Sequence, residues 1–580
     1  MILQALVDYY KALAACGKIA QPGWANVKIS HAMEIDDDGK LLLIHPLKEK
    51  DKTGKKLIPR MIELPAPIMR TVDVAANLGW DNAMYMLGLH SKGKPERTKQ
   101  CFAAARELHL KLLGELDDPF VKAICAFFNS WDIETAHENP NVAAIAEDLA
   151  AGENLVFMYQ GILASKNQAL RAAWQSSYDS DKEGETMCCL ITGQNVVPEA
   201  THPQIKNVRD AQSSGAALIS FNASAFCSYD REQNLNAPIG KYAAFAYTTA
   251  LNQLLSDNDK VVHIGDSTVV FRAESAEEQY PSALVQFMNA DNNITDADLK
   301  SVMKKLSQGR VVDWNGLPLK PDNRFYVLGL SPNASRISVR FFLRDSFGNF
   351  AKHLQSHYER LEIEPEFDNN TSLPIWKLLR ETVNPNANDK KAAPQMSGDV
   401  MRAILTGGRY PSTLYQGVQL RIRADRKINY TRAAIIKAYL LRNTTNNACR
   451  EVLTVQLNKD TRYQPYILGR LFSVLESIQN AANPGINTTI KDKYISAACA
   501  TPAKIFPTLL NLSEKHLRKL DKGLDVHYSK QVQELLSLID TSYPAHHSIE
   551  DQGIFQIGYY HQTQKRYEKN NTTSNNKEVN

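Results

Sequence analysis

The sequence predicts an α+β protein, in which an irregular multi-part α/β N-terminal region is followed by a C-terminal helical bundle. Up to about residue 384, runs with period-two apolar spacing alternate with runs at helical spacing. Beyond residue 451, apolar side chains recur mainly at three- and four-residue steps. At 580 residues the chain is also too long for a single core, and its length predicts about three or four domains.

The first elements follow from spacing and turn signals. Residues 1–18 place apolar side chains at helical spacing, without the basic start and cleavage site of a signal peptide. Strand-like alternation up to residue 65, around turns at DDDG (36–39) and KTGKK (52–56), predicts a small sheet. Helical spacing returns over 73–90 and in FAAARELHLKLLGEL (102–116), so helices are expected to follow the sheet.

Further strands are predicted in the middle of the chain, with helices between some of them. The expected strands are LITG (190–193), entered through the buried vicinal cysteines of CCLIT, ALISF (217–221), HIGDSTVVF (263–271), FYVLGL (325–330) and SRISVRFF (335–342). The last of these alternates with period two, as a half-buried strand does.

Changes of composition predict where the parts of the chain meet. The boundaries that we expect are an α+β region over 1–384, a linker or exposed loop over 385–396, a basic connecting region over 397–450, a helical bundle over 451–567 and a disordered tail over 568–580. In the bundle, YILGRLFSVLESIQ (466–479) carries one apolar stripe, and helical runs recur over 490–499, 502–520, 531–539 and 552–567.

Composition excludes several classes of protein. Net charge is only +4, so a nucleic-acid surface must come from local clustering of charge. The eight cysteines lack paired C-x-x-C spacing, and we expect reduced thiols. No run approaches the roughly 18–20 apolar residues that span a bilayer. We therefore expect a cytoplasmic protein that does not contact a membrane.

Signatures of catalysis are missing: the sequence has no G-x-x-x-x-G-K-[ST], H-E-x-x-H or G-x-S-x-G. DNNITDAD (291–298) begins like a calcium loop but lacks the required glycine and glutamate. Asp266 could be a nuclease carboxylate, although a turn between two strands is the simpler interpretation. His353 and His357 share a helix face and could bind a metal, but a solvent-facing helix is favoured. We expect no catalytic residue, metal or cofactor.

The strongest local charge lies over 401–442, which holds nine basic residues and one acid, Asp425. Four interleaved tyrosines could stack on bases or sugars. Alternatively, several arginines pair with acids elsewhere or solubilise an exposed helix. Such an excess of like charge favours contact with a nucleic-acid backbone. The residues that we expect to make it are Arg402, Arg409, Arg421, Arg423, Arg426 and Lys427.

Two polar segments are candidates for reading bases. In 70–99, Asn77 and Asn82 precede a basic loop with Lys92 and Lys94, a combination suited to a short duplex element. A capped helix start with a solvated loop behind it is the alternative. In 211–238, hydroxyls, amides and small residues surround short apolar runs, which suits recognition more than acid-base chemistry. A turn between core strands with locally bonded amides is the alternative.

Long segments resemble a known family. CLITGQ (189–194), THPQIKNVRDAQSSGAALISFNASAF (201–226) and YDREQNLNAPIGKYAAFAYTTALNQLL (229–255) resemble the large subunit of the type I-C CRISPR Cascade surveillance complex, the C subtype of the eighth CRISPR-associated family. Further resemblance follows in the same order at MILQALVDYY (1–10), IGDSTVVFRAES (264–275), LGLSPNASRISVRFF (328–342), SGDVMRAILTGGRYP (397–411) and FQIGYYHQTQ (555–564). The similarity spans almost the whole chain.

The resemblance implies a non-catalytic subunit that recognises the protospacer-adjacent motif in double-stranded DNA, helps to open the duplex, stabilises the R-loop and displaced strand, and supports recruitment of a helicase-nuclease. The implied partners are crRNA, target DNA, the crRNA-processing subunit, the repeated backbone subunit and a small subunit. That small subunit can come from an internal start, which near Val452 would need a non-methionine codon because Met401 is the last methionine.

The resemblance gives the candidate residues their expected roles. Asn77, Asn82, Lys92 and Lys94 would lie near the adjacent motif, and a polar wedge or contact loop would contain Gln212, Ser213, Ser214 and Asn222. The arginines and the lysine of the basic region would contact phosphates of guide or displaced strand. Two alternatives stay open, a metal-dependent nuclease and an RNA-binding assembly factor.

Overall fold

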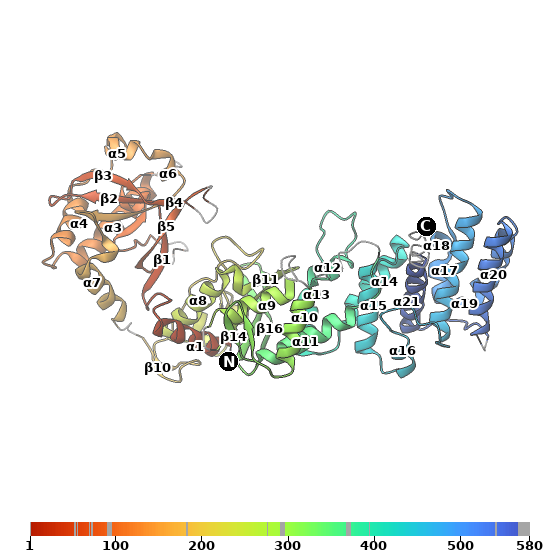
Figure 1. The fold of residues 1–580 in the computed structure, drawn as a ribbon. Coiled ribbons are helices and arrows are strands. Elements are labelled where there is room, and N and C mark those ends of the chain that lie inside the picture. The colour runs from red at the N-terminus through yellow and green to blue at the C-terminus, as the bar shows by residue number, and fades with distance from the viewer. Residues whose placement is uncertain are drawn as a thin grey trace, which may run out of the picture. The chain divides into compact units, whose positions relative to one another are not determined.

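The chain forms two compact units in a computed structural model (Figure 1). The structure describes residues 2–50, 54, 56–68, 70, 74–89, 95–180, 184–274, 277–289, 296–366, 373–393, 395–539 and 542–566. Unit 1 comprises Met1–Ile205 and Ala217–Gln253, and unit 2 comprises Lys206–Ala216 and Leu254–Asn580. Each unit has its own hydrophobic core.

Unit 1 mixes short strands with helices. Its strands are β1 (Trp24–Ile29), β2 (His31–Ile35), β3 (Leu41–Pro46), β4 (Lys48–Lys50), β5 (Leu57–Pro65), β6 (Trp80–Asn82), β7 (Asn154–Tyr159), β8 (Ile162–Leu163), β9 (Met187–Cys188) and β10 (Asn195–Val196). Its helices are α1 (Ile2–Ala15), α2 (Ala83–Met86), α3 (Pro95–Leu113), α4 (Pro119–Ser130), α5 (Pro140–Ala143), α6 (Ala146–Ala150), α7 (Gln168–Asp179) and α8 (Lys241–Leu255).

Two sheets organise unit 1. One has the order β1-β5-β4, and the other has the order β3-β2-β7-β6 with β8 paired to β7. The β2–β7 pair is parallel and sets His31 opposite Leu155, whereas the other pairs are antiparallel. Phe128 of α4 meets Phe157 of β7 edge-on, with ring centroids 5.6 Å apart. The core therefore lies between this sheet and the helices, and the predicted early sheet is confirmed.

Unit 2 combines one larger sheet with many helices. Its strands are β11 (Val261–Ile264), β12 (Ser267–Ala273), β13 (Val312–Trp314), β14 (Leu317–Leu319), β15 (Arg324–Asn333) and β16 (Arg336–Ser346). Its helices are α9 (Gln279–Asn289), α10 (Asp296–Ser307), α11 (Phe347–Leu361), α12 (Ile375–Arg380), α13 (Met396–Thr406), α14 (Ser412–Asp425), α15 (Tyr430–Asn443), α16 (Asn447–Glu451), α17 (Gln464–Ala482), α18 (Ile490–Ala500), α19 (Pro502–Leu517), α20 (Lys522–Ser537) and α21 (Ile549–Lys565).

The sheet of unit 2 is antiparallel, with the order β11-β12-β15-β16. Its helix-facing side is apolar: Phe325 of β15 lies 5.4 Å from Phe347 and 5.9 Å from Phe350 of α11, between ring centroids. The predicted strands at 325–330 and 335–342 are confirmed. The run 263–271, predicted as one strand, instead forms the hairpin of β11 and β12.

The C-terminal part of unit 2 is helical, as predicted. Each expected helical run falls on one of α17–α21, although the runs 502–520, 531–539 and 552–567 extend two or three residues past the helix ends. Almost every residue of the first four turns of α17 is buried, because other helices surround it (Figure 1). The core of unit 2 is continuous from Val262 to Tyr560. The expected domain boundaries at 384 and 450 lie inside this unit and remain predictions. The tail over 568–580 lies outside the described residues.

Three local predictions are wrong. Over 74–89 only α2 is helical, because Gly79 takes φ +79° and Asp81 binds the preceding backbone. LITG is a turn between β9 and β10, so Cys189 is buried but Leu190 is 68% exposed. ALISF forms no strand: only Ala217 makes an isolated bridge, and the backbone is irregular from Leu218 to Phe221. All eight cysteines are free, as expected.

Among the described residues, no helix combines the length and apolar character needed to cross a membrane.

Candidate nucleic-acid interface

The segment before α2 is organised around the buried carboxylate of Asp81. It accepts hydrogen bonds from the Arg70 guanidinium, one of them at 3.0 Å, and from the Asn77 backbone N–H at 3.0 Å. The Oδ1 atom of Asn77 in turn accepts a hydrogen bond from the Ile68 N–H at 3.0 Å. Asn77 is 4% exposed, so its side chain stabilises this segment from inside.

Asn82 lies at the start of α2 and is half-buried. Its Oδ1 accepts a hydrogen bond from the Met84 N–H at 3.0 Å, which makes it the N-cap of the helix. The capping interpretation is thus confirmed for Asn82, and contact with DNA stays a prediction. Lys92 and Lys94 lie outside the described residues.

The polar segment contributes to both units. In unit 2, Gln212, Ser213 and Ser214 are exposed. The segment is anchored just before them, because the Arg209 N–H donates a hydrogen bond to Thr268 Oγ1 at 3.1 Å. In unit 1, Asn222 is exposed. The structure therefore leaves the surfaces of these four residues open to solvent, as recognition requires.

Downstream of Asn222, the side-chain amide of Asn236 stabilises an exposed loop of unit 1. The Oδ1 atom of Asn236 accepts a hydrogen bond from the Ser228 N–H at 2.8 Å, and its Nδ2 donates to the Arg231 and Gln233 carbonyls at 2.9 Å each. The alternative of locally bonded amides is confirmed for Asn236. Tyr229, on the same loop, is 94% exposed and takes φ +55°.

Part of the basic region is neutralised inside the fold. Arg421 and Arg432 both pair with Asp425, and Arg432 Nε also donates to Glu381 Oε2 at 2.7 Å. Burial alone would raise the pKa of Asp425, but the two guanidinium groups outweigh it and hold that pKa below its usual range. Arg421 is buried, so its guanidinium stabilises the connection between α14 and α15.

Other cations of the region face solvent. Arg402, Arg409, Arg423 and Lys427 are exposed and Arg426 is half-buried. Arg402 lies 3.8 Å from Asp399 in an exposed pair, an interaction that contributes little. Arg423 donates to Gln552 Oε1 at 2.9 Å, and Arg426 to the Arg423 carbonyl at 3.0 Å. Arg402, Arg409, Arg423 and Lys427 therefore form the accessible part of the predicted phosphate contacts.

The tyrosines of this region serve the core. Tyr410 and Tyr415 are buried, and Tyr439 stacks on Tyr415 with ring centroids 4.4 Å apart. The Tyr415 hydroxyl donates to the Ile549 carbonyl at 2.7 Å. The expected stacking on bases is thus closed to Tyr410 and Tyr415 in the folded protein.

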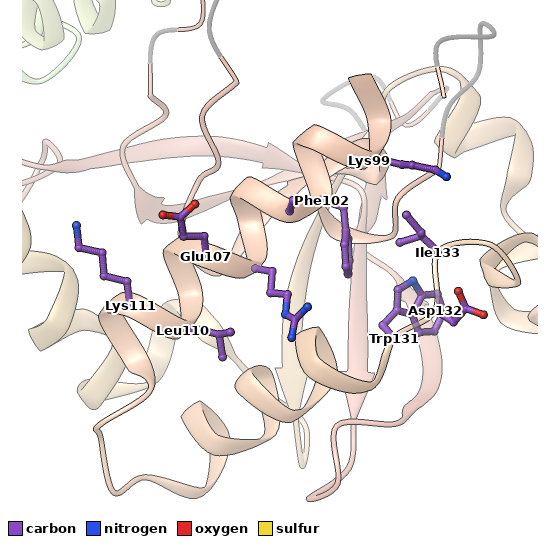
Figure 2. Close-up of a pocket in the computed structure, with 10 residues that line it drawn as sticks. Lys99, Phe102, Glu107, Leu110, Lys111, Trp131, Asp132 and Ile133 are labelled. Atoms are coloured by element: carbon purple, nitrogen blue, oxygen red, sulfur yellow. The ribbon is translucent and has the colours of Figure 1, made fainter. Parts of the chain in front are cut away.

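A groove of about 730 Å³ lies along α3 in unit 1 (Figure 2). Its lining comprises Lys99, Phe102, Ala103, Arg106, Glu107, Leu110 and Lys111 of α3, and Trp131, Asp132 and Ile133 after α4. Lys99 pairs with Glu134 at 2.7 Å, and Trp131 stacks on Phe127 at 5.1 Å. Because acids accompany the cations, its charge is too mixed to indicate one ligand.

One cluster of possible metal ligands occurs in the described part of the chain: His31, Asp148 and Glu153. The Lys48 ammonium lies 2.7 Å from Asp148 Oδ2 and 2.9 Å from Glu153 Oε2. The ammonium bridges the two carboxylates and offsets part of their charge, so the cluster is an ion-pair network. His31 is far from the two acids in sequence, and the parallel β2–β7 pairing brings it beside the segment that holds them.

Asp266 occupies the turn between β11 and β12, as predicted. Its carboxylate accepts hydrogen bonds from Ser397, from Ser331 Oγ at 3.1 Å and from Arg340 Nη2 at 3.0 Å. Burial alone would raise its pKa, but these donors lower it. Ser267 Oγ also donates to it at 3.3 Å. Because all of these donors come from its own unit, the carboxylate has a structural role.

The predicted solvent-facing position of His353 and His357 is wrong. His357 is 2% exposed, with Nδ1 2.6 Å from the Tyr410 hydroxyl, and His353 Nδ1 donates to the Leu405 carbonyl at 2.7 Å. α11 packs against α13 and α15, so its histidine face points inward.

The described residues thus form an α+β framework that exposes polar and basic side chains. The family model described as CRISPR-associated protein (Cas_Csd1) matches residues 6–567. The chain therefore belongs to the Csd1 family of CRISPR-associated proteins, the large subunit of type I-C Cascade. Membership implies interaction with crRNA and other Cascade components. No curated protein matches the chain.

Proposed function

We propose that this large subunit recognises the protospacer-adjacent motif in double-stranded DNA, helps to open the duplex, stabilises the R-loop and displaced strand, and supports recruitment of the helicase-nuclease. The observation that carries the proposal is the exposure of Gln212, Ser213, Ser214 and Asn222 on a member of this family. Uncharged donors and acceptors can form hydrogen bonds with base edges. The protein needs to read only a short duplex element, because base pairing with the guide specifies the rest of the target.

Backbone contact accompanies motif reading in this proposal. The exposed Arg402, Arg409, Arg423 and Lys427 supply positive charge without an extensive intramolecular network. Contact of this kind holds guide or displaced strand without regard to sequence and weakens with salt. The chain has a non-catalytic role, with the crRNA-processing, backbone and small subunits as its neighbours.

Asn82, Lys92 and Lys94 would assist motif reading from unit 1. Asn82 already caps α2 through Oδ1, so only its Nδ2 donor would face a base edge. Asn77 would act indirectly, by holding the segment before α2.

The test is binding of target duplexes to the guide-loaded complex, with and without this chain. Matched duplexes differ only in the adjacent motif, and binding is measured at two salt concentrations. We expect motif-selective binding to disappear when the chain is omitted, and to weaken in a Gln212→Ala, Asn222→Ala variant with nonspecific binding retained.

The matched control is Arg409→Gln, which should weaken binding of both duplexes alike, because a phosphate contact carries no sequence information. Motif selectivity that survives omission of the chain would refute the proposal. Metal-dependent cleavage by the isolated chain would instead favour a nuclease.

A further inference from the structure

One tryptophan of unit 2 is exposed on a short helix. Trp376 lies on α12 and is 52% exposed, whereas the other tryptophans of the chain are buried or half-buried. In the described part of the chain, its indole N–H makes no hydrogen bond and its ring meets no other aromatic ring. Folded proteins bury most of the surface of this residue type. The exposed ring is therefore available to a ligand.

The packing of α12 sets this orientation. Ile375, Leu378 and Leu379 are buried, and the helix packs against α13 and α15. The other side of the helix carries Trp376 and Arg380, which are four residues apart and so are neighbours on one face. Arg380 is exposed, and among the described residues its guanidinium forms neither an ion pair nor a hydrogen bond. An indole and a guanidinium thus lie side by side at the surface.

The end of α12 is fixed to the connection between α14 and α15. Glu381, which directly follows Arg380, accepts hydrogen bonds from Arg432 Nε at 2.7 Å and from Asn429 Nδ2 at 3.2 Å. Arg432 Nη1 in turn donates to the Lys427 carbonyl at 2.9 Å. Lys427 is exposed. The indole and guanidinium of α12 therefore adjoin the exposed part of the basic region.

The carboxylates at this corner of unit 2 are bonded to the protein itself. Glu381 and Asp425 both pair with Arg432. Glu366 accepts a hydrogen bond from the Tyr430 N–H at 2.9 Å. The exposed arginine of α12 and the exposed lysine after α14, by contrast, form no ion pair in the described part of the chain. This surplus of positive charge favours a polyanionic ligand over a basic or purely apolar protein segment.

We propose that Trp376 and Arg380 form a stacking site for one base of single-stranded nucleic acid, with Arg380 on the adjoining phosphate. Every base has a π-face, so an indole holds a strand without regard to its sequence. Tyr410 and Tyr415 of the basic region are unsuited to this role because they are buried. The displaced DNA strand as the ligand rests on the proposed function, whereas stacking on the indole does not.

The test is a titration of the full chain with an oligodeoxythymidine that carries one fluorescent adenine analogue, whose emission falls when it stacks. Trp376→Ala should bind about tenfold more weakly and lose the change in emission, because one stacking contact is removed. Trp376→Phe keeps an aromatic ring and should retain most of both. The matched control is Leu317→Ala, which removes another exposed apolar side chain of unit 2 and should bind as the wild type does.

Salt dependence separates the roles of the two residues. Arg380→Gln should weaken binding and make the slope of log affinity against log salt shallower by about 0.7, because a phosphate contact is lost. Trp376→Ala should leave that slope unchanged, since it removes no charge. Arg450→Gln, at an exposed arginine of α16, is the control and should alter neither the affinity nor the slope.

Several results would overturn the proposal. Equal oligonucleotide binding by the wild type, Trp376→Ala and Leu317→Ala overturns the stacking site. Wild-type oligonucleotide binding by Trp376→Ala, together with its failure to assemble into the guide-loaded complex, would assign the indole to a contact with another protein subunit. Dependence on Trp376 with an oligouridine and not with the oligodeoxythymidine would place the guide there and overturn the displaced-strand assignment.

Motif selectivity of the guide-loaded complex is measured with the same variants, as a separate readout of the proposed function. Selectivity that persists in Trp376→Ala, beside weaker oligonucleotide binding, supports the stacking site. If the wild-type complex shows no selectivity while Trp376→Ala still loses oligonucleotide binding, the proposed function fails and the stacking site stands.

Discussion

Gly469 of α17 lies directly against the carbonyl oxygen of Phe555 of α21, so that even one Cβ at this position would overlap it. Gly558 of α21 lies in the same way against the carbonyl of Tyr466 of α17. Two glycines, one on each helix, thus bring the backbones of α17 and α21 together. The close approach of α17 and α21 depends on the absence of two side chains.

Gly469→Ala should lower the free energy of unfolding by about 3 kcal/mol, because the obstructing atom belongs to the backbone and cannot move aside. Urea unfolding of the full chain measures the change. Gly523→Ala is the control, since its Cβ would meet only the Asp521 side chain at 3.2 Å and alanine is the better helix former, so this variant should be at least as stable as the wild type. Equal stability of both variants would contradict the close packing of α17 and α21.

Arg432→Gln should destabilise the chain by about 3 kcal/mol, because it leaves Asp425 and Glu381 without their shared buried partner. Arg409→Gln should leave stability unchanged within about 0.5 kcal/mol, since Arg409 is exposed. Thermal unfolding and DNA binding are measured for both variants. A stable Arg432→Gln with weakened DNA binding would reverse the roles that we assign to buried and exposed arginines.

Substitution of Asn82 separates capping from base reading. Asn82→Ala should cost about 1 kcal/mol of stability, whereas Asn82→Asp keeps an oxygen that accepts from the Met84 N–H and should be stable. If Nδ2 reads a base edge, both variants should lose motif selectivity, because neither retains the donor. Full selectivity in Asn82→Asp would restrict Asn82 to capping.

Stability should fall in mild acid because of His109. This ring is fully buried, and burial lowers its pKa from 6.5 to about 4. Below about pH 6.5 the unfolded chain binds a proton that the folded chain binds only near pH 4. The contribution is therefore complete above pH 6.5 and is lost as the pH falls toward 4, by about 3 kcal/mol.

His109→Gln checks this pH dependence. The neutral ring accepts a hydrogen bond from the Gly79 N–H at 2.9 Å and donates to the Ala105 carbonyl at 2.7 Å. Glutamine can do both and does not titrate. The free energy of unfolding should depend less on pH between 6.5 and 4, although other buried histidines keep part of the slope. An unchanged slope would show that His109 does not contribute to it.

Asp266→Asn should destabilise unit 2 by about 2 kcal/mol, since Arg340 would lose its anionic partner. The exposed Asp322→Asn is the control and should have no measurable effect. Urea unfolding and incubation with DNA and Mg²⁺ are compared. DNA cleavage that Asp266→Asn abolishes would restore the nuclease interpretation of this carboxylate.

The fold class, most strands of unit 2 and the helices α17–α21 could be predicted from sequence patterns. These elements have strong periodicity, because each buries one face and so repeats its apolar residues at a fixed interval. The sequence also determined the family, since the resemblance rests on long ordered segments that match independently of packing. The turn position of Asp266 followed from local chemistry in the same way.

Which polar residues are accessible could be known only once the fold was known. Arg421 and Arg409 are alike in sequence, but Asp425 pairs with Arg421 while Arg409 faces solvent. The sequence pattern predicts that His357 faces solvent, yet α11, which carries it, packs against α13 and α15, and the residue is buried. The pairing of a charge is set by groups distant along the chain. A local pattern therefore gives the chemistry of a residue, and the fold gives its partner and its exposure.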